Sequence, residues 1–239
     1  MSDLLTIAVR AHGGLDRWRE LTEITAHAHG GGLLWGGKGH EGIFADTHVT
    51  IDPRVQRASH DPIGAPGRRT VYTPERVAIE ADDGTVLAER HDPRAAFDGH
   101  GPGTAWDELH VVYFGGYAIW NYLTLPFVLT YPGVEVAEVE PWEEEPGQVR
   151  RRLAAVFPDD IATHSREQTF HFDDTGLLRR HDYVADVVGG NRIAHYTDDY
   201  RDFGGIRYPT RRRAYRRSAD GRAGGPALVT VDLPEVRVR

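Results

Sequence analysis

Histidine, aspartate and tyrosine residues in the last third of the chain have the types and the spacing that acid–base chemistry needs. An aspartate that orients a histidine is the arrangement from which a general base is built. The sequence brings two such pairs together, His195 with Asp182 and His181 with Asp198, each beside a tyrosine. The candidate catalytic residues are His195, Asp182, His181, Asp198, Tyr183 and Tyr196.

The partners in these pairs depend on one predicted turn. Two strand-like runs flank a Gly-Gly pair at 189–190, which is typical of a two-residue hairpin turn. Such a turn predicts that His181 lies opposite Asp198, and it places Asp182 diagonal to His195. A bulge of one residue would exchange the two faces of the strand. In the alternative interpretation, both histidines only form hydrogen bonds across strands on a solvated face.

An aromatic segment near the middle of the chain is a second candidate site. Thr104-x-x-Asp107 resembles a capping box, and apolar residues then recur at three–four spacing, which predicts a helix over 105–122. Its aromatic face could line a pocket for an apolar ligand, or it could be plain core packing between helix and sheet. The candidate ligand-binding residues are Trp106, His110, Tyr113, Tyr117, Trp120 and Tyr122.

Two further clusters have weaker chemical interpretations. His27 and His29 point the same way on a strand, and imidazole pairs can bind zinc, copper or iron. The sequence offers no third ligand at a recognisable spacing and no HExxH motif, so we expect no metal site. An arginine cluster could hold a carboxylate or a phosphate, although a solvated face paired with acids is the interpretation we favour. Its members are Arg211, Arg212, Arg213, Arg216 and Arg217.

The elements that must position these residues are mostly strands. A short helix is expected from Ser2 or Asp3 to the Gly13-Gly14 pair, and from Thr22 onward the apolar period changes to two. Some ten or eleven short runs with Pro, Gly or Asp between them predict an antiparallel sheet or barrel. With no repeat or strong linker in the sequence, we expect one domain over 1–239, with the inserted aromatic helix covering its concave face.

Short motifs at both ends of the chain resemble the LolA-like superfamily, which includes lipoprotein carriers, their sigma-regulator relatives and VioE-like enzymes. The motifs are Ala11-His12-Gly13-Gly14 with Trp18, Phe172-Asp173…Gly176-Leu177-Leu178, and Tyr200…Gly205-Ile206…Pro209-Thr210. The resemblance implies a half-open antiparallel β-barrel with helices in its mouth, mainly β within an α+β class. It also implies an apolar ligand or, as in VioE-like members, chemistry without a cofactor.

Composition excludes several classes of protein. The chain of 239 residues has no cysteine, which excludes disulfides, thiolate zinc sites and a cysteine nucleophile. Its net charge of −8 argues against nucleic-acid binding. The uncharged stretch 109–134 contains His110, Asn121 and a Gly-Gly pair, so we interpret it as a buried helix rather than a membrane span. The first apolar run, over 4–9, is shorter than a secretion signal needs, so we expect a cytoplasmic protein.

Two hypotheses follow from these observations. In the first, which we favour, the protein binds a hydrophobic small molecule or lipid in a half-barrel cavity. In the alternative, the same cavity belongs to a cofactor-independent enzyme, a cyclase, isomerase, dehydratase or hydrolase, that uses His, Asp and Tyr as acid–base groups. The absence of a P-loop and of a GxSxG motif removes the usual support for nucleotide and hydrolase classes. We expect no cofactor in either case.

Overall fold

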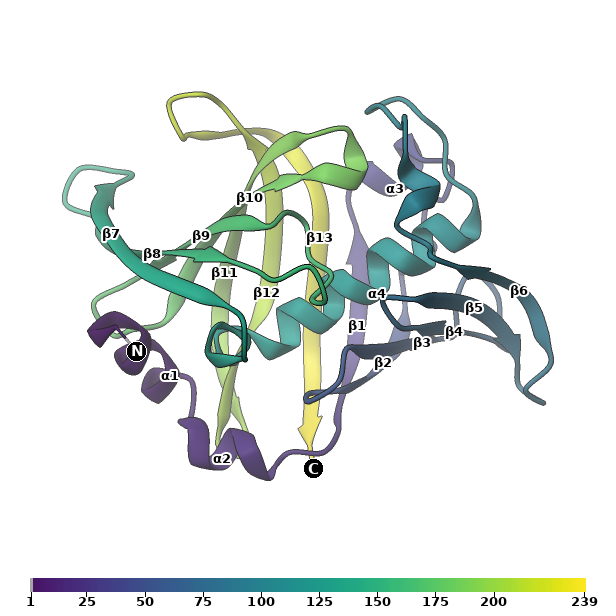
Figure 1. Cartoon of the computed structure of the whole chain (residues 1–239), viewed down its shortest axis with the longest axis horizontal. Coiled ribbons are helices and arrows are strands. Elements are labelled where there is room, and N and C mark those ends of the chain that lie inside the picture. Colours follow the sequence, from purple (N-terminus) through teal and green to yellow (C-terminus); the bar gives the residue numbers. More distant parts are fainter. Residues whose placement is uncertain (1) are drawn as a thin grey trace.

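The computed structural model describes residues 2–239, which form one thirteen-stranded antiparallel sheet with helices against it (Figure 1). The strands are β1 (Ile24–Gly31), β2 (Thr47–Asp52), β3 (Arg57–Asp61), β4 (Arg68–Tyr72), β5 (Arg76–Ala81), β6 (Val86–His91), β7 (Glu135–Glu143), β8 (Val149–Val156), β9 (Glu167–Phe172), β10 (Leu178–Ala185), β11 (Asn191–Phe203), β12 (Ile206–Arg217) and β13 (Ala223–Val238). The helices are α1 (Asp3–Ala11), α2 (Leu15–Glu20), α3 (Leu33–Gly37), α4 (Glu108–Thr124) and the 3-10 turns η1 (Ala95–Phe97), η2 (Phe127–Thr130) and η3 (Asp186–Val188).

The sheet consists of two meanders that meet at the first and the last strand. Its order is β6-β5-β4-β3-β2-β1-β13-β12-β11-β10-β9-β8-β7, and every pair is antiparallel. The sheet curves around its contents but does not close, because β6 and β7 are its two edges. The predicted mainly β, half-open fold is therefore confirmed, with more strands than the ten or eleven expected.

Helix α4 connects the two edges of the sheet across its concave side (Figure 1). It begins later than predicted because Asp107, not Thr104, is the N-cap. The Asp107 carboxylate accepts the backbone N–H of His110 at 2.9 Å, and His110 Nδ1 accepts the backbone N–H of Asp107 at 3.2 Å. Thr104 instead accepts a hydrogen bond from the Gly101 N–H in the preceding turn. The expectation of a helix against the concave face is confirmed, with a start at Glu108 and an end at Thr124.

Two glycines let α4 approach the sheet closely. A Cβ atom added at Gly115 would lie 2.5 Å from Cζ of Phe44, and one added at Gly116 would lie 2.3 Å from Cγ of Tyr72. Both distances are far below van der Waals contact, so any larger residue would push the helix away from these buried rings. The Gly-Gly pair therefore sets the depth at which the aromatic helix packs.

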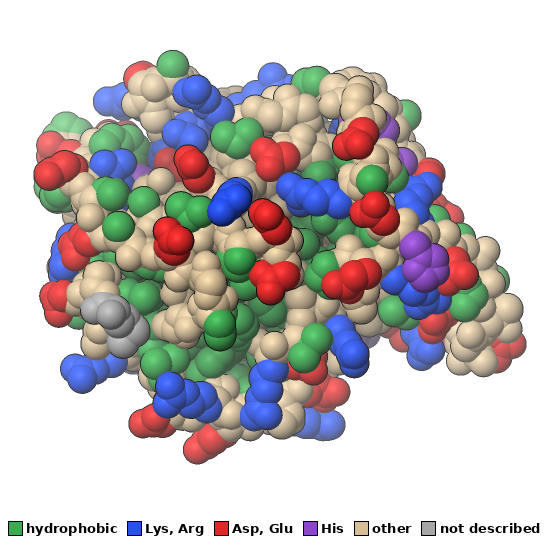
Figure 2. All heavy atoms as spheres, viewed as in Figure 1, with side chains coloured by type: hydrophobic (Ala, Val, Ile, Leu, Met, Phe, Trp, Pro, Cys, Tyr) green, Lys and Arg blue, Asp and Glu red, His purple; other side chains and the backbone are tan. Residues whose placement is uncertain are grey.

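The N-terminal helices cover one end of the sheet. Ser2 caps α1 by accepting the backbone N–H of Leu5, and Trp18 of α2 stacks on Phe127 with ring centroids 4.2 Å apart. Short helix α3, which the sequence pattern did not predict, covers the opposite end near the start of α4 (Figure 1). Within residues 2–239, no helix is long and apolar enough to cross a membrane. Apolar side chains gather near the middle of the face shown in Figure 2, among scattered charged ones.

Candidate functional site

A cluster of buried tyrosine and histidine side chains lies between α4 and the strands β10 and β11. We call it the Tyr–His cluster, and its members are Tyr117, Tyr122, His164, His181, Tyr183 and His195. Each of them is at most 4 % exposed. Helix α4 supplies two tyrosines, the loop before β9 supplies His164, and the inward faces of β10 and β11 supply the rest.

His164 links the helix to the sheet. Its Nδ1 lies 3.2 Å from the hydroxyl of Tyr117, and its Nε2 lies 3.1 Å from the hydroxyl of Tyr122. A neutral imidazole has one donor and one acceptor, so one hydroxyl donates to it and the other accepts from it. The ring also stacks on Tyr183 at a centroid distance of 4.0 Å. Burial lowers the pKa of His164 to about 3, so this histidine is uncharged at neutral pH.

The two histidines of the last hairpin are buried in the same way. His181 lies directly opposite His195, and its Nε2 forms a short hydrogen bond with the side-chain oxygen of Gln168. The Tyr183 hydroxyl lies 3.5 Å from Nδ1 of His195. Burial, with a smaller contribution from the nearby positive charge of Arg212, lowers the pKa of both histidines well below its usual value. Both histidines are therefore uncharged at neutral pH.

The predicted Asp182–His195 and His181–Asp198 pairs are wrong, because the hairpin has a longer turn than expected. Strand β10 ends at Ala185, and the five residues 186–190, including η3, form the connection to β11. The register shifts by three residues, and an odd shift exchanges the faces. Asp182 now lies opposite Ala194, and Asp198 lies opposite Arg211 of β12.

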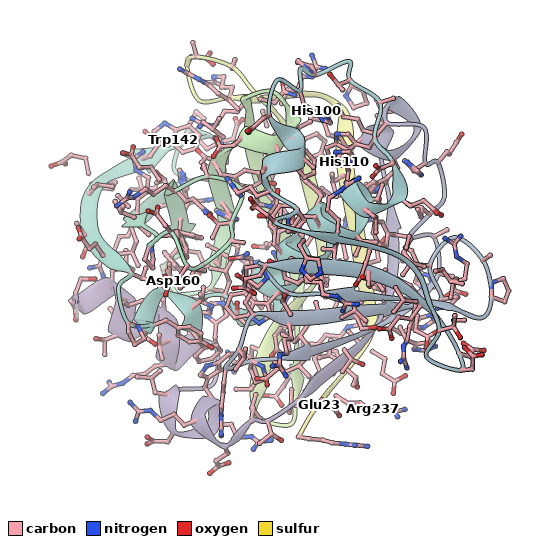
Figure 3. All side chains as sticks on the ribbon, turned by 45° about the vertical axis from the view of Figure 1, so that its right-hand side comes forward. Glu23, His100, His110, Trp142, Asp160 and Arg237 are labelled. Carbon is pink, nitrogen blue, oxygen red and sulfur yellow. The ribbon has the colours of Figure 1, made fainter. Side chains whose placement is uncertain are left out.

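Asp182 belongs to an ion network on the outer face of the sheet. Asp182 receives two hydrogen bonds from Arg180, at 2.6 and 3.0 Å, and Glu144 accepts a third from the same guanidinium at 2.6 Å. Tyr196, the last of the predicted catalytic residues, donates to Glu144 in this network. Trp142 covers Arg180 at 4.5 Å and lies on the β7 side of the molecule, far from His110 (Figure 3). His171 also belongs to this network, since its Nε2 lies 3.3 Å from Oδ2 of Asp182. Because the network lies outside the concave interior, we interpret it as structural.

Two neighbouring cavities enter the concave interior. The larger, of about 180 Å³, lies between α3, the β10–β11 turn and the strands β12 and β13, and it reaches Tyr183. The smaller, of about 40 Å³, is almost entirely apolar and reaches Tyr122. Phe114 and Val229 line both cavities, so these two side chains form the wall between them. Both cavities therefore end at the Tyr–His cluster.

The predicted ligand-binding residues have divided roles. Tyr122 borders the small cavity, and Tyr113 borders a separate polar cleft of about 440 Å³ near Arg94. Tyr117 belongs to the Tyr–His cluster. The other three are structural: Trp106 packs on Phe97 and Phe114, Trp120 donates to the carbonyl of Asp52, and His110 caps α4 beside His100 (Figure 3).

Arg212 is a buried cation that the sequence analysis assigned to a solvated face. Its side chain is 1 % exposed, and its guanidinium lies over the ring of Tyr122 at 4.8 Å. One nitrogen donates to the carbonyl of Tyr122 at 2.7 Å, whereas Nε and Nη1 meet no acceptor in the described chain. A buried charge with unpaired donors is costly, so the site favours an anionic partner. Strand alternation could have indicated that Arg212 is buried, because it places Arg212 on the same face as the apolar residue Ala214.

Other residues of the site left no signal in the sequence. His164 lies in a loop without periodicity, and Gln168 and Val229 are ordinary strand residues. Phe114 belongs to the aromatic helix, but nothing in its spacing distinguishes it from its neighbours as a wall between cavities. Such roles depend on how distant segments pack, which local patterns do not encode.

Comparison with solved structures identifies the class of fold. A DUF1329 family protein from Desulfovibrio piger superposes with a TM-score of 0.58 at 13% identity, covering 98% of this chain and 91% of that one. A domain described as an outer membrane lipoprotein-sorting protein, from Vibrio parahaemolyticus, has a TM-score of 0.57 at 8% identity, with 99% and 91% covered. A LolA superfamily protein from Nitrosomonas europaea has a TM-score of 0.53 at 10% identity, with 99% and 92% covered.

These likenesses show that the chain has a LolA-like fold, as the motifs at its ends implied. Comparison of the sequence with protein-family models and with curated proteins gives no match. The identities are too low to carry more than the fold. The function must therefore be argued from the cavities and the side chains around them.

Proposed function

We propose that the protein binds a lipophilic small molecule or lipid in the concave interior of its sheet. The observation that carries the proposal is the 180 Å³ cavity, which passes between α3 and the β10–β11 turn to the Tyr–His cluster. LolA-like neighbours, one described as a lipoprotein-sorting protein, support the same class of ligand. Mostly apolar walls with a few polar groups at one end are typical of small-molecule sites.

The walls of this cavity are suited to an apolar chain or ring. Its apolar members are Leu33, Leu34, Pro102, Phe114, Ala185, Val188, Ile193, Ala214, Leu228 and Val229. Leu33 is 57% exposed, so apolar surface extends from the cavity to solvent. Lys38 also lines the cavity, but its ammonium group donates to the carbonyls of Pro102 and Thr104 at 2.9 and 2.8 Å and is already satisfied.

Arg212 gives the proposed ligand a polar end. Val231, which lies opposite Arg212 in the β12–β13 register, lines the small cavity together with Tyr122, the residue that the guanidinium covers. Two direct neighbours of Arg212 thus line the small cavity, and Nε and Nη1 of Arg212 have no acceptor in the described chain. An acidic group on a lipophilic molecule would satisfy them through charge-assisted hydrogen bonds. We therefore include in the proposal a preference for an amphiphile with a carboxylate or phosphate.

Displacement of a fluorescent probe tests both parts of the proposal, the lipophilic site and the preference for an acidic group. N-phenyl-1-naphthylamine, an uncharged apolar dye, is bound first and is then displaced by dodecanoate or dodecanol. Both should displace the dye, and dodecanoate should bind about 10-fold more tightly, as one or two hydrogen bonds to a charged group imply. Arg212→Met should abolish this preference while dye and dodecanol still bind, and Arg212→Lys should keep part of it.

The outcomes separate the two parts of the proposal. If neither the dye nor either amphiphile binds, the lipophilic site is wrong. If wild-type protein binds dodecanoate and dodecanol equally, or if Arg212→Met keeps the preference, only the acidic group is wrong. Far-ultraviolet circular dichroism of each variant establishes that it is folded.

The enzyme alternative rested on two particular His–Asp pairs, and the structure does not bring either pair together in the concave interior. It required an aspartate to orient a histidine of the cavity, whereas the Asp182 carboxylate lies in the outer network with Arg180 and 3.3 Å from Nε2 of His171. His181 and His195 instead contact tyrosine, phenylalanine and glutamine side chains. Binding is therefore the function that the site supports best.

A further inference from the structure

Three histidines and an aspartate meet on the outer face of β1 and β2, remote from the concave interior. His27 Nε2 lies 2.6 Å from Oδ1 of Asp46, and His29 Nδ1 lies 3.9 Å from the same oxygen. The ligand atoms of these three residues all lie within 4.8 Å of one another. His48 adds a fourth side chain, because its ring stacks on that of His27 at a centroid distance of 4.8 Å.

Strand geometry explains why these residues meet. His27 and His29 share the outward face of β1, since Ala26 and Ala28 point into the core. His48 lies directly opposite His27 in the β1–β2 register, and Asp46 immediately precedes β2. The sequence shows only the His27–His29 pair. The remaining ligands come from pairing with a strand some twenty residues away.

We propose that His27, His29 and Asp46 bind one divalent transition-metal ion of the zinc type, with His48 as a further ligand. Metal–nitrogen and metal–oxygen bonds of about 2.0–2.2 Å put two ligands of a tetrahedral ion about 3.3 Å apart. The two separations from Asp46, 2.6 and 3.9 Å, bracket this value, and all three ligand atoms lie within 4.8 Å of one another, so side-chain rotations can bring them to one ion. Two or three imidazoles with one carboxylate favour zinc, copper or nickel over magnesium or calcium, which prefer all-oxygen sites.

The surroundings of the cluster are consistent with a cation. Within the described residues, the Asp46 carboxylate forms ion pairs only with His27 and His29, so no arginine or lysine competes with a metal ion for it. On β13, Glu235 faces His27 and Asp232 faces His29, and each is neutralised by an arginine, Arg237 and Arg213 respectively. The carboxylate of Asp46 is 73% exposed, which leaves an open path for the ion.

Zinc binding to the purified full-length chain tests the proposal. After stripping with a chelator, isothermal titration with Zn²⁺ should give one ion per chain, whereas Mg²⁺ and Ca²⁺ should give no comparable binding. The double variant His27→Gln/His29→Gln should bind Zn²⁺ at least about 10-fold more weakly, since two ligands are lost. His91→Gln, a change at an exposed histidine of β6, is the matched control and should bind as wild type does.

Two results would overturn the metal site. One is Zn²⁺ affinity in the double variant equal to that of the His91→Gln control. The other is the absence of stoichiometric Zn²⁺ binding in wild-type protein. Because the altered side chains lie on the outer face, the metal-free variants should melt as the metal-free wild type does. A second variant, Asp46→Asn, removes only the carboxylate and should also weaken binding.

Discussion

Both ring nitrogens of His164 lie within hydrogen-bond distance of tyrosine hydroxyls, and the residue is 1 % exposed. Burial has the same effect on two histidines elsewhere in the core. It lowers the pKa of His12 to about 4, and it lowers the pKa of His60 to about 4. Each of these three histidines is protonated near pH 6.5 in the unfolded chain, whereas in the folded protein it stays uncharged to a lower pH.

This difference predicts a steep loss of stability in mild acid. Between pH 6.5 and pH 4 the unfolded state binds more protons, so the free energy of unfolding falls as the pH falls. Each fully buried histidine contributes a slope of about 1.4 kcal/mol per pH unit in that range. His164→Gln, which keeps a donor and an acceptor, should remove one such contribution. Urea unfolding at pH 7, 6 and 5 measures the slope.

A matched variant distinguishes the effect of a buried histidine from the effect of removing any histidine. His91→Gln alters an exposed histidine of β6 and should leave the slope unchanged. Equal slopes in wild-type protein and His164→Gln would contradict the assignment of His164 as a buried, uncharged residue.

At the scale of single residues, the sequence predicted which residue types lie in the interior better than it predicted which of them contact one another. His181, Tyr183 and His195 were singled out by type, and all three lie in the Tyr–His cluster. Their partners were wrong, because Asp182 faces outward. Arg212 was predicted to be solvated, although its alternation with Arg211 and Arg213 already separated it from them.

At the scale of elements, periodicity located most strands, but it could not fix one register. The Gly-Gly pair at 189–190 is typical of a complete two-residue turn, whereas here it only ends a longer connection that begins with η3. Val187 and Val188 continue an apolar pattern that is typical of a strand, although both residues lie in the turn and are buried there. The error of three residues was therefore invisible in the local sequence.

The packing of α4 gives a prediction about Gly116. Gly116→Ala places a methyl group against the buried ring of Tyr72, and we expect a loss of about 1–3 kcal/mol in the free energy of unfolding from overpacking. Gly36→Ala in α3 is the control, because the nearest atom to its added Cβ lies 3.9 Å away. It should be neutral or stabilising by up to about 1 kcal/mol. Equal changes in both variants, measured by urea unfolding, would refute the close approach of α4.

At the scale of the whole molecule, an open sheet and a single crossing helix leave a partly filled interior. The edges β6 and β7 stand apart and are joined across the concave side by α4. The helix fills most of the concave side and leaves a pair of cavities on either side of Phe114. The sequence predicted this architecture because strand spacing and the aromatic helix are local signals, but the cavities arise only from the assembled packing.

Native mass spectrometry of protein purified from its own host tests the lipophilic site most directly. Wild-type protein should carry one non-covalent molecule that denaturation releases and organic solvent extracts. Ala185→Leu, which fills part of the 180 Å³ cavity, should lose that molecule, whereas Ala154→Leu on the outer face of β8 should keep it. An adduct retained equally in Ala185→Leu, or wild-type protein with no adduct at all, would contradict a ligand-binding interior.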